Sequence, residues 1–259
     1  NLEKAAVLAR AKAERWAGNH PEKLETLREG AQLLAQNRCR DALECFLGVM
    51  LWPRDDSMCF VPPGMATMQE GAEAAALGVH GFFADRTEVS ESEFAAFAAQ
   101  APGGGWPLPG YLRGTPLNET GKEAPVVSIP LYYAQAFAAG YDDAFPDAYV
   151  RAFEAWEEMP QEGGKQIPTE AQWVRAAQYV QENSVQIENM AARAAEWTQT
   201  RFGGLPYGPE DERDDASSLS FGVPAVVRGA GRSPEAALSS RHPLAWDAAE
   251  PGVGFRCVK

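Results

Sequence analysis

The sequence predicts an α+β fold for most of a chain of 259 residues. Three observations indicate this class. Apolar, strand-like segments are short and end in glycine or proline; helical patterns are interspersed among them without regular alternation; and short apolar segments return after a Gly/Pro/Asp/Ser-rich stretch, 203–224. Few long strands with interspersed helices are typical of α+β domains and not of a doubly wound parallel sheet.

The first 56 residues predict a helical segment that precedes the domain. Apolar residues recur at helical spacing over 2–17, 21–36 and 40–51, and Pro21 suits the first turn of the second helix. The composition changes at Trp52-Pro53-Arg-Asp-Asp56. We therefore expect a helical segment over 1–56 and a domain over 57–259. Two interpretations stay open for the helices: they end a helical repeat array or form a linker, or they pack on the domain as a cap.

Within the domain, short strands and helices follow one another in irregular order. We expect strands at 59–64, 79–85, 124–130 and 225–227, helices at 91–100, 131–139 and 169–179, and a helical insertion over 141–160. Two helix starts carry local signals. Ser90, with Glu93 three residues later, predicts a capping box, and Thr169 can cap a helix whose first turn holds Glu170.

The charge balance excludes one class of partner. The chain has 23 Lys and Arg against 36 Asp and Glu, a net charge of −13. A strongly acidic surface repels phosphate backbones, so we expect no nucleic-acid partner. No apolar run approaches the length of about 20 residues that spans a bilayer, so we expect no membrane span.

The cysteines and histidines do not predict a metal site. The four cysteines (Cys39, Cys45, Cys59, Cys257) include no Cys-x-x-Cys pair, and the three histidines (His20, His80, His242) are scattered. Buried free thiols are compatible with a reducing compartment, which favours a cytoplasmic location. Surface display stays open because the sequence starts at Asn1 and a targeting segment could have been removed.

Six short motifs of the domain are informative because they occur together and in a particular order. They are Phe60–Gly64, Phe83–Ser90, Ala124–Ser128, Gln166–Trp173, Asn189–Thr198, and Arg228-Gly-Ala-Gly together with Gly254-Phe-Arg256. The most specific is Gln166-Ile-Pro-Thr-Glu-Ala-Gln-Trp173, which is close to R-L-P-T-E-A-E-W. Together they resemble the formylglycine-generating enzyme/sulfatase-modifying-factor family over residues 58–258. The resemblance implies a C-type-lectin-like fold.

The sequence departs from this family where the family's chemistry is done. The enzyme oxidises a substrate cysteine with two copper-binding cysteines between its R-G-G-S and G-F-R motifs, but residues 232–253 contain no cysteine, and Cys257 lies beyond Gly-Phe-Arg. A related branch holds iron with three histidines, which are not clustered here. We therefore expect no enzymatic activity, no metal and no cofactor. Where the family binds calcium through an asparagine the chain has Arg193, and we expect Arg193 to pair with a carboxylate.

Four charged positions in the matching motifs are candidates for buried ion pairs. They are Glu88, Glu196, Arg228 and Arg256. We expect them to hold the irregular core together and to have a structural role.

The segment between the Arg228-Gly and Gly254-Phe-Arg strands is the candidate ligand-binding surface. Its candidate residues are Arg232, Ser233, Glu235, Ser239, Ser240, Arg241, His242, Trp246 and Asp247. A mixture of Arg, Trp and His with small polar residues is typical of adaptable protein-binding surfaces. We expect a protein ligand, or with less weight a glycan. Against a binding role, Ala236-Ala-Leu238 fits a short packed helix, and Arg241 fits a structural arginine of the family.

Three hypotheses for function stay open. The first is a non-catalytic ligand-binding module, which resembles the variable proteins of diversity-generating retroelements. The second is a regulatory or sensor domain of a bacterial Ser/Thr kinase or another signalling protein. The third is a divergent oxidase of the formylglycine-generating type.

Overall fold

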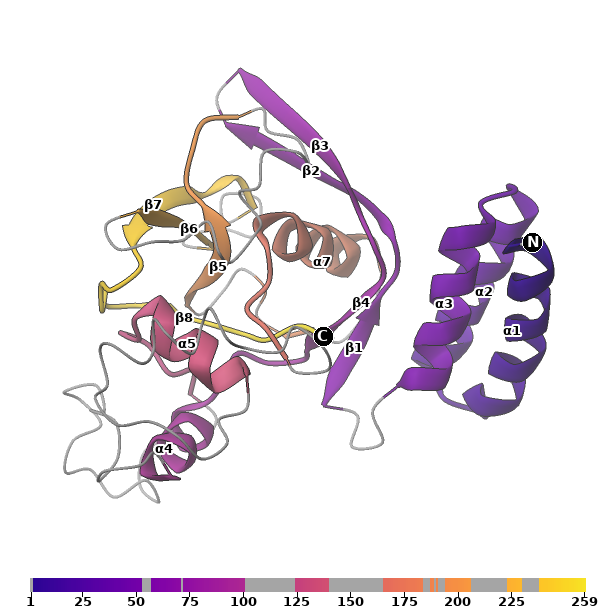
Figure 1. The fold of residues 1–259 in the computed structure, drawn as a ribbon, viewed down its shortest axis with the longest axis horizontal. Helices are drawn as coiled ribbons and strands as arrows, with labels where there is room; N and C mark the ends of the chain where they lie inside the picture. Colours follow the sequence, from indigo (N-terminus) through magenta and orange to yellow (C-terminus); the bar gives the residue numbers. More distant parts are fainter. Residues whose placement is uncertain are drawn as a thin grey trace.

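The computed structural model describes residues 2–52, 57–70, 72–100, 124–139, 165–183, 187–188, 190, 194–205, 223–229 and 238–259. In this part of the chain a bundle of helices, α1 to α3, lies beside a larger body of strands and helices (Figure 1). The mixture of helices with small antiparallel and mixed sheets is the α+β class that the sequence predicts. The expected insertion at 141–160 and Arg193 lie outside the described residues.

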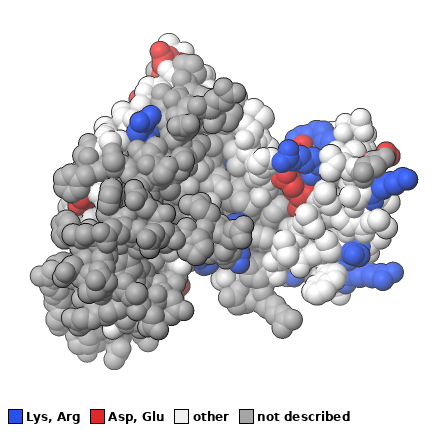
Figure 2. Space-filling model, in the orientation of Figure 1, with Lys and Arg blue, Asp and Glu red and all other residues white. Residues whose placement is uncertain are grey.

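The N-terminal helices form as expected: α1 is Leu2–Ala17, α2 is Pro21–Ala35 and α3 is Cys39–Leu51. Helix α1 buries a stripe of alanines, Ala6, Ala9, Ala13 and Ala17, which lets it approach its neighbours closely. Gly30 of α2 has the same role, because a Cβ at this position would lie 2.7 Å from the ring of Phe46 in α3. Lys, Arg, Asp and Glu side chains intermingle on the outside of the helices (Figure 2).

The helices pack on the domain through a shared hydrophobic cluster and through polar contacts. Trp52, after α3, meets Phe83 edge to face at 5.9 Å between ring centroids. Glu44 accepts a hydrogen bond from the Gly81 amide at 2.8 Å, and Glu22 accepts one from Arg86 at 3.0 Å. His80 Nδ1 lies 3.0 Å from Glu44. These contacts support the interpretation of the helices as a cap. The expected boundary falls within residues 53–56, outside the described residues, and stays a prediction.

Glu29 of α2 lies in the seam between helices and domain. Burial raises the pKa of its carboxyl group, and the nearby Arg175, which would lower it, does not compensate. A carboxyl group with a raised pKa binds its proton more tightly in the folded protein than in the unfolded chain, so stability falls as pH rises through that pKa.

We expect Glu29→Gln to raise Tm by about 2 °C at pH 7.5 and to change it little at pH 4. Differential scanning calorimetry with Glu25→Gln as control checks this. A lower Tm for Glu29→Gln at pH 7.5 would show that the charge stabilises the seam.

Two antiparallel pairs begin the domain. Strand β1 (Met58–Val61) pairs with β4 (Phe82–Asp85). Between them, β2 (Gly64–Glu70) and β3 (Glu73–Val79) form a long ribbon with a continuous register from Gly64↔Val79 to Glu70↔Glu73. One face of the ribbon buries Ala66, Met68, Ala75 and Leu77, and the ribbon packs on α7 (Glu170–Glu182). The ribbon curves around α7 and leads down toward β1 and β4 (Figure 1).

The remaining strands form a four-stranded sheet with the order β7-β6-β5-β8. Its strands are β5 (Ala195–Arg201), β6 (Pro224–Arg228), β7 (Arg241–Ala245) and β8 (Val253–Gly254). The register of β6 and β7 runs from Pro224↔Ala245 to Arg228↔Arg241. After β8 the chain runs back to β4, where the Lys259 amide bonds to Phe83. This return places the C-terminus beside β1 and β4 (Figure 1).

Two expected strands differ from the structure. Over 124–130 the described backbone forms only an isolated bridge between Pro125 and Ser90, because the two prolines lack an amide donor and Ser128 has a positive φ of 58°. The segment 79–85 is not one continuous strand: Val79 ends β3, His80 and Gly81 follow, and 82–85 form β4. The helices follow the predictions: α4 is Glu91–Gln100, α5 is Leu131–Ala138, and α7 starts at Glu170 with Thr169 as its cap.

The backbone at Gly254 packs closely against the backbone at Val126, next to the second hydrophobic cluster. That cluster joins α4 and α5 to β5, β6 and the C-terminal segment, with Trp197 and Phe255 fully buried. A Cβ on Gly254 would lie 2.5 Å from the Val126 carbonyl oxygen. Backbone cannot yield as a flexible side chain does, so we expect Gly254→Ala to destabilise the protein by about 2–3 kcal/mol in urea denaturation. Gly78→Ala is the matched control, since nothing lies within 4 Å of its Cβ; equal midpoints for the two variants would contradict the close approach.

Candidate functional site

The candidate surface lies on strand β7 and the turns at its two ends. Three of the candidate residues, Arg232, Ser233 and Glu235, lie outside the described residues. The six described candidates divide into two groups. Ser239, His242 and Asp247 are exposed and Ser240 is partly exposed, whereas Arg241 and Trp246 are both buried with 7% of their surface accessible. The structure therefore brings together an outward group and an inward group on one short segment.

The buried side chain of Arg241 links β7 to three other segments of the domain. Its Nε donates to Glu170 Oε1 at 2.8 Å, and its Nη1 donates to the Gly203 carbonyl at 2.7 Å and to Glu70 Oε2 at 3.0 Å. Its guanidinium also lies over the Phe202 ring, 4.6 Å from the centroid. These contacts tie β7 to α7, to the end of β2 and to the segment after β5. These contacts favour a structural role for Arg241, which the sequence left open beside a ligand contact.

Arg228, the last residue of β6, holds the chain just before it enters β7. It is fully buried and forms an ion pair with Glu170. Its Nη1 donates to the carbonyl oxygens of Leu238 at 2.9 Å and Ser240 at 3.2 Å. Glu170 is therefore a single buried carboxylate shared by two buried arginines, one in β6 and one in β7. The sequence predicted Glu170 only as a favourable first-turn acid.

Trp246 fixes the other end of β7. Its ring meets Tyr132 of α5 at 5.5 Å between centroids, and its carbonyl oxygen accepts the Leu131 amide at 2.8 Å. Asp247, the next residue, is exposed. His242 also points outward, and its Nε2 lies 2.8 Å from the Ser240 hydroxyl. The outward side chains thus stand on a backbone that is held at both ends.

A second buried ion pair supports the same face of the sheet, because Glu196 lies directly opposite Arg228 in the register of β5 and β6. Arg256 donates to Glu196 through Nε at 2.7 Å and Nη2 at 2.6 Å, and Trp173 Nε1 donates to the same carboxylate at 2.9 Å. Burial alone would lower the pKa of Arg256, but the charge of Glu196 raises it above its usual value. Ion pairs involving Arg228, Arg256 and Glu196 are confirmed. Glu88 accepts the Ala194 amide at 3.2 Å.

Capping also positions these charges. Thr169 and Gln172 form a reciprocal capping box, and the Glu170 amide donates to Thr200 Oγ1 at 2.7 Å. Glu170 is thereby directed into the protein, toward Arg228 and Arg241. Ser90 and Glu93 form the other predicted capping box.

The described residues contain no group of three or more His, Cys, Asp or Glu side chains arranged to hold a metal ion. Cys45, Cys59 and Cys257 are buried, and Cys39 is partly exposed. Burial, with Asp85 nearby, raises the pKa of the Cys257 thiol well above its usual value. None of the helices in this part of the chain combines the length and the apolar character needed to cross a bilayer.

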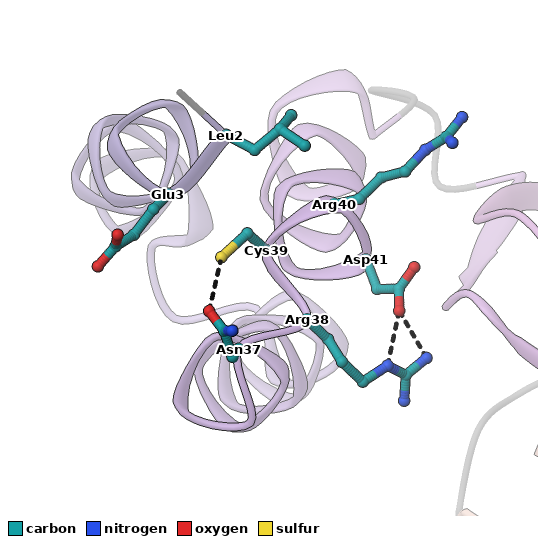
Figure 3. Close-up of a pocket in the computed structure, with 7 residues that line it drawn as sticks. All are labelled: Leu2, Glu3, Asn37, Arg38, Cys39, Arg40 and Asp41. Atoms are coloured by element: carbon teal, nitrogen blue, oxygen red, sulfur yellow. Dashed lines mark hydrogen bonds and ion pairs between the residues drawn. The ribbon is translucent and has the colours of Figure 1, made fainter.

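A hollow of about 430 Å³ lies away from β7, at the start of α1 and α3. Figure 3 shows Cys39 and Asn37 facing each other there, with 3.7 Å between Sγ and Oδ1, and Arg38 paired with Asp41 at 2.6 Å. Two pairs of its polar side chains, Cys39 with Asn37 and Arg38 with Asp41, contact each other, whereas Arg40 pairs with Glu44 one turn further along α3.

Comparison with one solved structure supports the fold. The structure is similar to "Treponema denticola variable protein 1", with a TM-score of 0.52 and 16% identity over 78% of this chain and 94% of that chain. It is also similar to CarF, with a TM-score of 0.49 and 16% identity over 78% of this chain and 98% of that chain.

A search of curated proteins found no match for the sequence. A family match, in contrast, covers residues 52–184, just over half of the chain, and includes Thr169, Glu170 and the whole β2–β3 ribbon. That match agrees with the order of the motifs and with the lectin-like architecture. The chain belongs to the family of sulfatase-modifying factor enzyme 1-like domains.

Proposed function

We propose that the chain is a non-catalytic ligand-binding module whose binding surface is formed by strand β7 and its flanking turns. One observation carries the proposal. The exposed side chains of Ser239, His242 and Asp247 stand on a backbone that Arg228, Arg241 and Trp246 hold from inside. A rigid frame that presents polar side chains loses little conformational entropy when a ligand binds.

The chemistry of the surface favours a protein ligand. A hydroxyl, an imidazole and a carboxylate offer donors and acceptors on a short segment, and Arg232, Ser233 and Glu235 precede it in the chain. Such mixed polar groups fit the polar parts of protein interfaces better than they fit a single ring of glycan hydroxyls. Arg241 and Trp246 act as supports in this proposal, and the ligand contacts come from the outward group.

The non-catalytic part of the proposal rests on the sequence of the same segment. Residues 232–253 hold none of the cysteines that the resemblance requires for oxidation. Stoichiometric copper on the purified protein, together with oxidation of a cysteine-containing peptide, would contradict it and favour a divergent oxidase.

Retroelement diversification is a finer part of the proposal. The structural neighbour is named a variable protein, and variable proteins of retroelements carry their variation between strands equivalent to β6 and β8. Sequence differences confined to 228–256 among sister copies of the gene would support diversification here. Differences spread evenly along the chain would contradict it.

A photo-crosslinking experiment tests the surface directly. Benzoylphenylalanine is placed singly at His242, at Ala74 on the exposed face of β3, and at Trp16 on α1, in cells that express the full chain. We expect one protein to crosslink from position 242 at a yield at least tenfold above that from position 74. Crosslinks from position 74 alone, or from neither position, would contradict the proposal.

One observation favours the second hypothesis, a regulatory domain of a signalling protein. The cap exposes large apolar side chains, with Leu8 67%, Trp16 65% and Leu51 69% accessible. In a larger assembly such side chains would contact another domain. Crosslinks that form only from position 16 would support this hypothesis over the first.

A further inference from the structure

A second hollow, of about 430 Å³, lies in the seam between the helical cap and the domain. Glu29 and Arg38 line it from the cap, and Gly64, Arg175 and Glu182 line it from the domain. It is separate from strand β7. Its charged groups include Arg175, whose ion pair with Glu182 is long at 3.8 Å, and Glu29, whose carboxyl group is desolvated by burial.

Arg175 is held in one orientation. Its Nε donates to the Pro62 carbonyl at 3.2 Å, and its guanidinium lies over the Tyr179 ring, 5.3 Å from the centroid. The same group lies flat against Gly64, since a Cβ there would be 2.5 Å from Nε. Its nearest carboxylate among the described residues is Glu182, at a long 3.8 Å from Nη1. The terminal nitrogens are therefore preorganised to bind a carboxylate in two parallel hydrogen bonds.

Glu29 offers the opposite charge. The structure gives it no hydrogen bond among the described residues, and Arg38, the other nearby cation, is paired with Asp41 at 2.6 Å. A carboxylate that loses water on burial without gaining donors is costly unless a cation approaches it. Glu182 lines the hollow from the domain side, so the hollow has a carboxylate on each of its two sides.

We propose that this hollow binds a free α-amino acid, with its carboxylate on Arg175 and its ammonium group between Glu29 and Glu182. The volume lies within the range of small-molecule sites. The two charges of a zwitterion match the two signs of charge in the hollow, and neither an anion nor a cation alone does so. A bound amino acid would bridge α2 and α7 and thereby strengthen the docking of the cap. This site is independent of the ligand surface on β7.

The test is a titration of the full chain with each of the twenty L-amino acids, with acetate and methylammonium as single-charge controls. We expect at least one amino acid to bind with a Kd below about 1 mM in calorimetry, and to raise Tm, while both controls bind at least tenfold more weakly. If no amino acid binds below about 10 mM, or if acetate or methylammonium binds as well as every amino acid, the proposal is wrong.

Variants locate the binding. Glu182→Gln, at a position 67% exposed, and Glu29→Gln are each expected to weaken binding at least tenfold without loss of folding. Gly64→Ala keeps every charge but displaces the Arg175 guanidinium, and it should weaken binding by a similar factor. Met65→Ala, which lines the same hollow without charge, is the matched control and should change Kd less than threefold. Equal Kd values for wild type and both glutamine variants would overturn the proposal.

Discussion

Replacing Glu170 by Gln is expected to destabilise the protein by about 3–5 kcal/mol and to lower Tm by roughly 6–15 °C. The carboxylate is fully buried and is shared by Arg228 and Arg241, whose side chains are also buried. Gln keeps the size of the side chain but removes the charge that balances two guanidinium groups. Thermal unfolding of both proteins at pH 7.5 measures the effect.

The matched control is Glu182→Gln at the other end of the same helix. Glu182 is largely exposed, and its contact with Arg175 is long, so its loss is expected to cost less than about 0.5 kcal/mol. If the Tm of Glu170→Gln stayed within 2 °C of the wild type, the buried arginines would be balanced by another group. The partly exposed Glu70, which Arg241 also contacts, would be the first candidate.

Arg256→Met is expected to have an effect of the same order, about 3–5 kcal/mol. The substitution leaves the Glu196 carboxylate fully buried, and the indole of Trp173 is then its remaining donor within the described part of the chain. It also removes the bonds from Arg256 to the carbonyl oxygens of Asp85 and Glu188, which join the C-terminal segment to two earlier parts of the chain. Chemical denaturation followed by tryptophan fluorescence reports this loss, because Trp173 lies beside the pair.

Arg28→Met on the exposed side of α2 is the control for this substitution, since its side chain is 66% exposed. We expect a change below about 0.5 kcal/mol for the control. A double variant, Arg256→Met with Glu196→Gln, should recover part of the stability, because the remaining pair carries no buried charge. A double variant that is less stable than Arg256→Met would show that the carboxylate stabilises the fold without its arginine.

Local signals predicted the helices well. The starts at Glu91 and Glu170 depend on capping boxes formed within four residues, and the N-terminal helices depend on apolar spacing and Pro21. These interactions are complete within one helix, so the sequence contains all the information that they require.

The β2–β3 ribbon and strand β7 were not predicted, for physical reasons. Strand β3 consists mostly of alanine, leucine and glycine, which have low intrinsic strand preference, and its pairing with β2 supplies the missing stabilisation. Strand β7 contains Pro243 and alternates little, and its place in the sheet is set by pairing with β6. Pairing partners and packing surfaces decide such strands, and a single sequence does not display them.

The candidate site was located by the sequence only as a segment. Although the family resemblance left a structural role open for Arg241, residue types alone did not separate His242 and Asp247 from Arg241 and Trp246. Their inward orientation depends on Glu170, which lies 71 residues from Arg241, and on α5, which packs against Trp246. The resemblance to a family named the buried charges Glu196, Arg228 and Arg256, but the pairing of Arg228 with Glu170 required the fold.

Hydrogen exchange of the free and the partner-bound protein tests the central claim most directly. The claim is that the buried side chains of Arg228, Arg241 and Trp246 hold β7 in place, so that its exposed side chains can bind a protein ligand. We expect amides in 238–248 to slow at least tenfold on binding, with little change in α1, α2, β2 and β3. Slowing confined to the helices or to the β2–β3 ribbon, with 238–248 unchanged, would contradict the account.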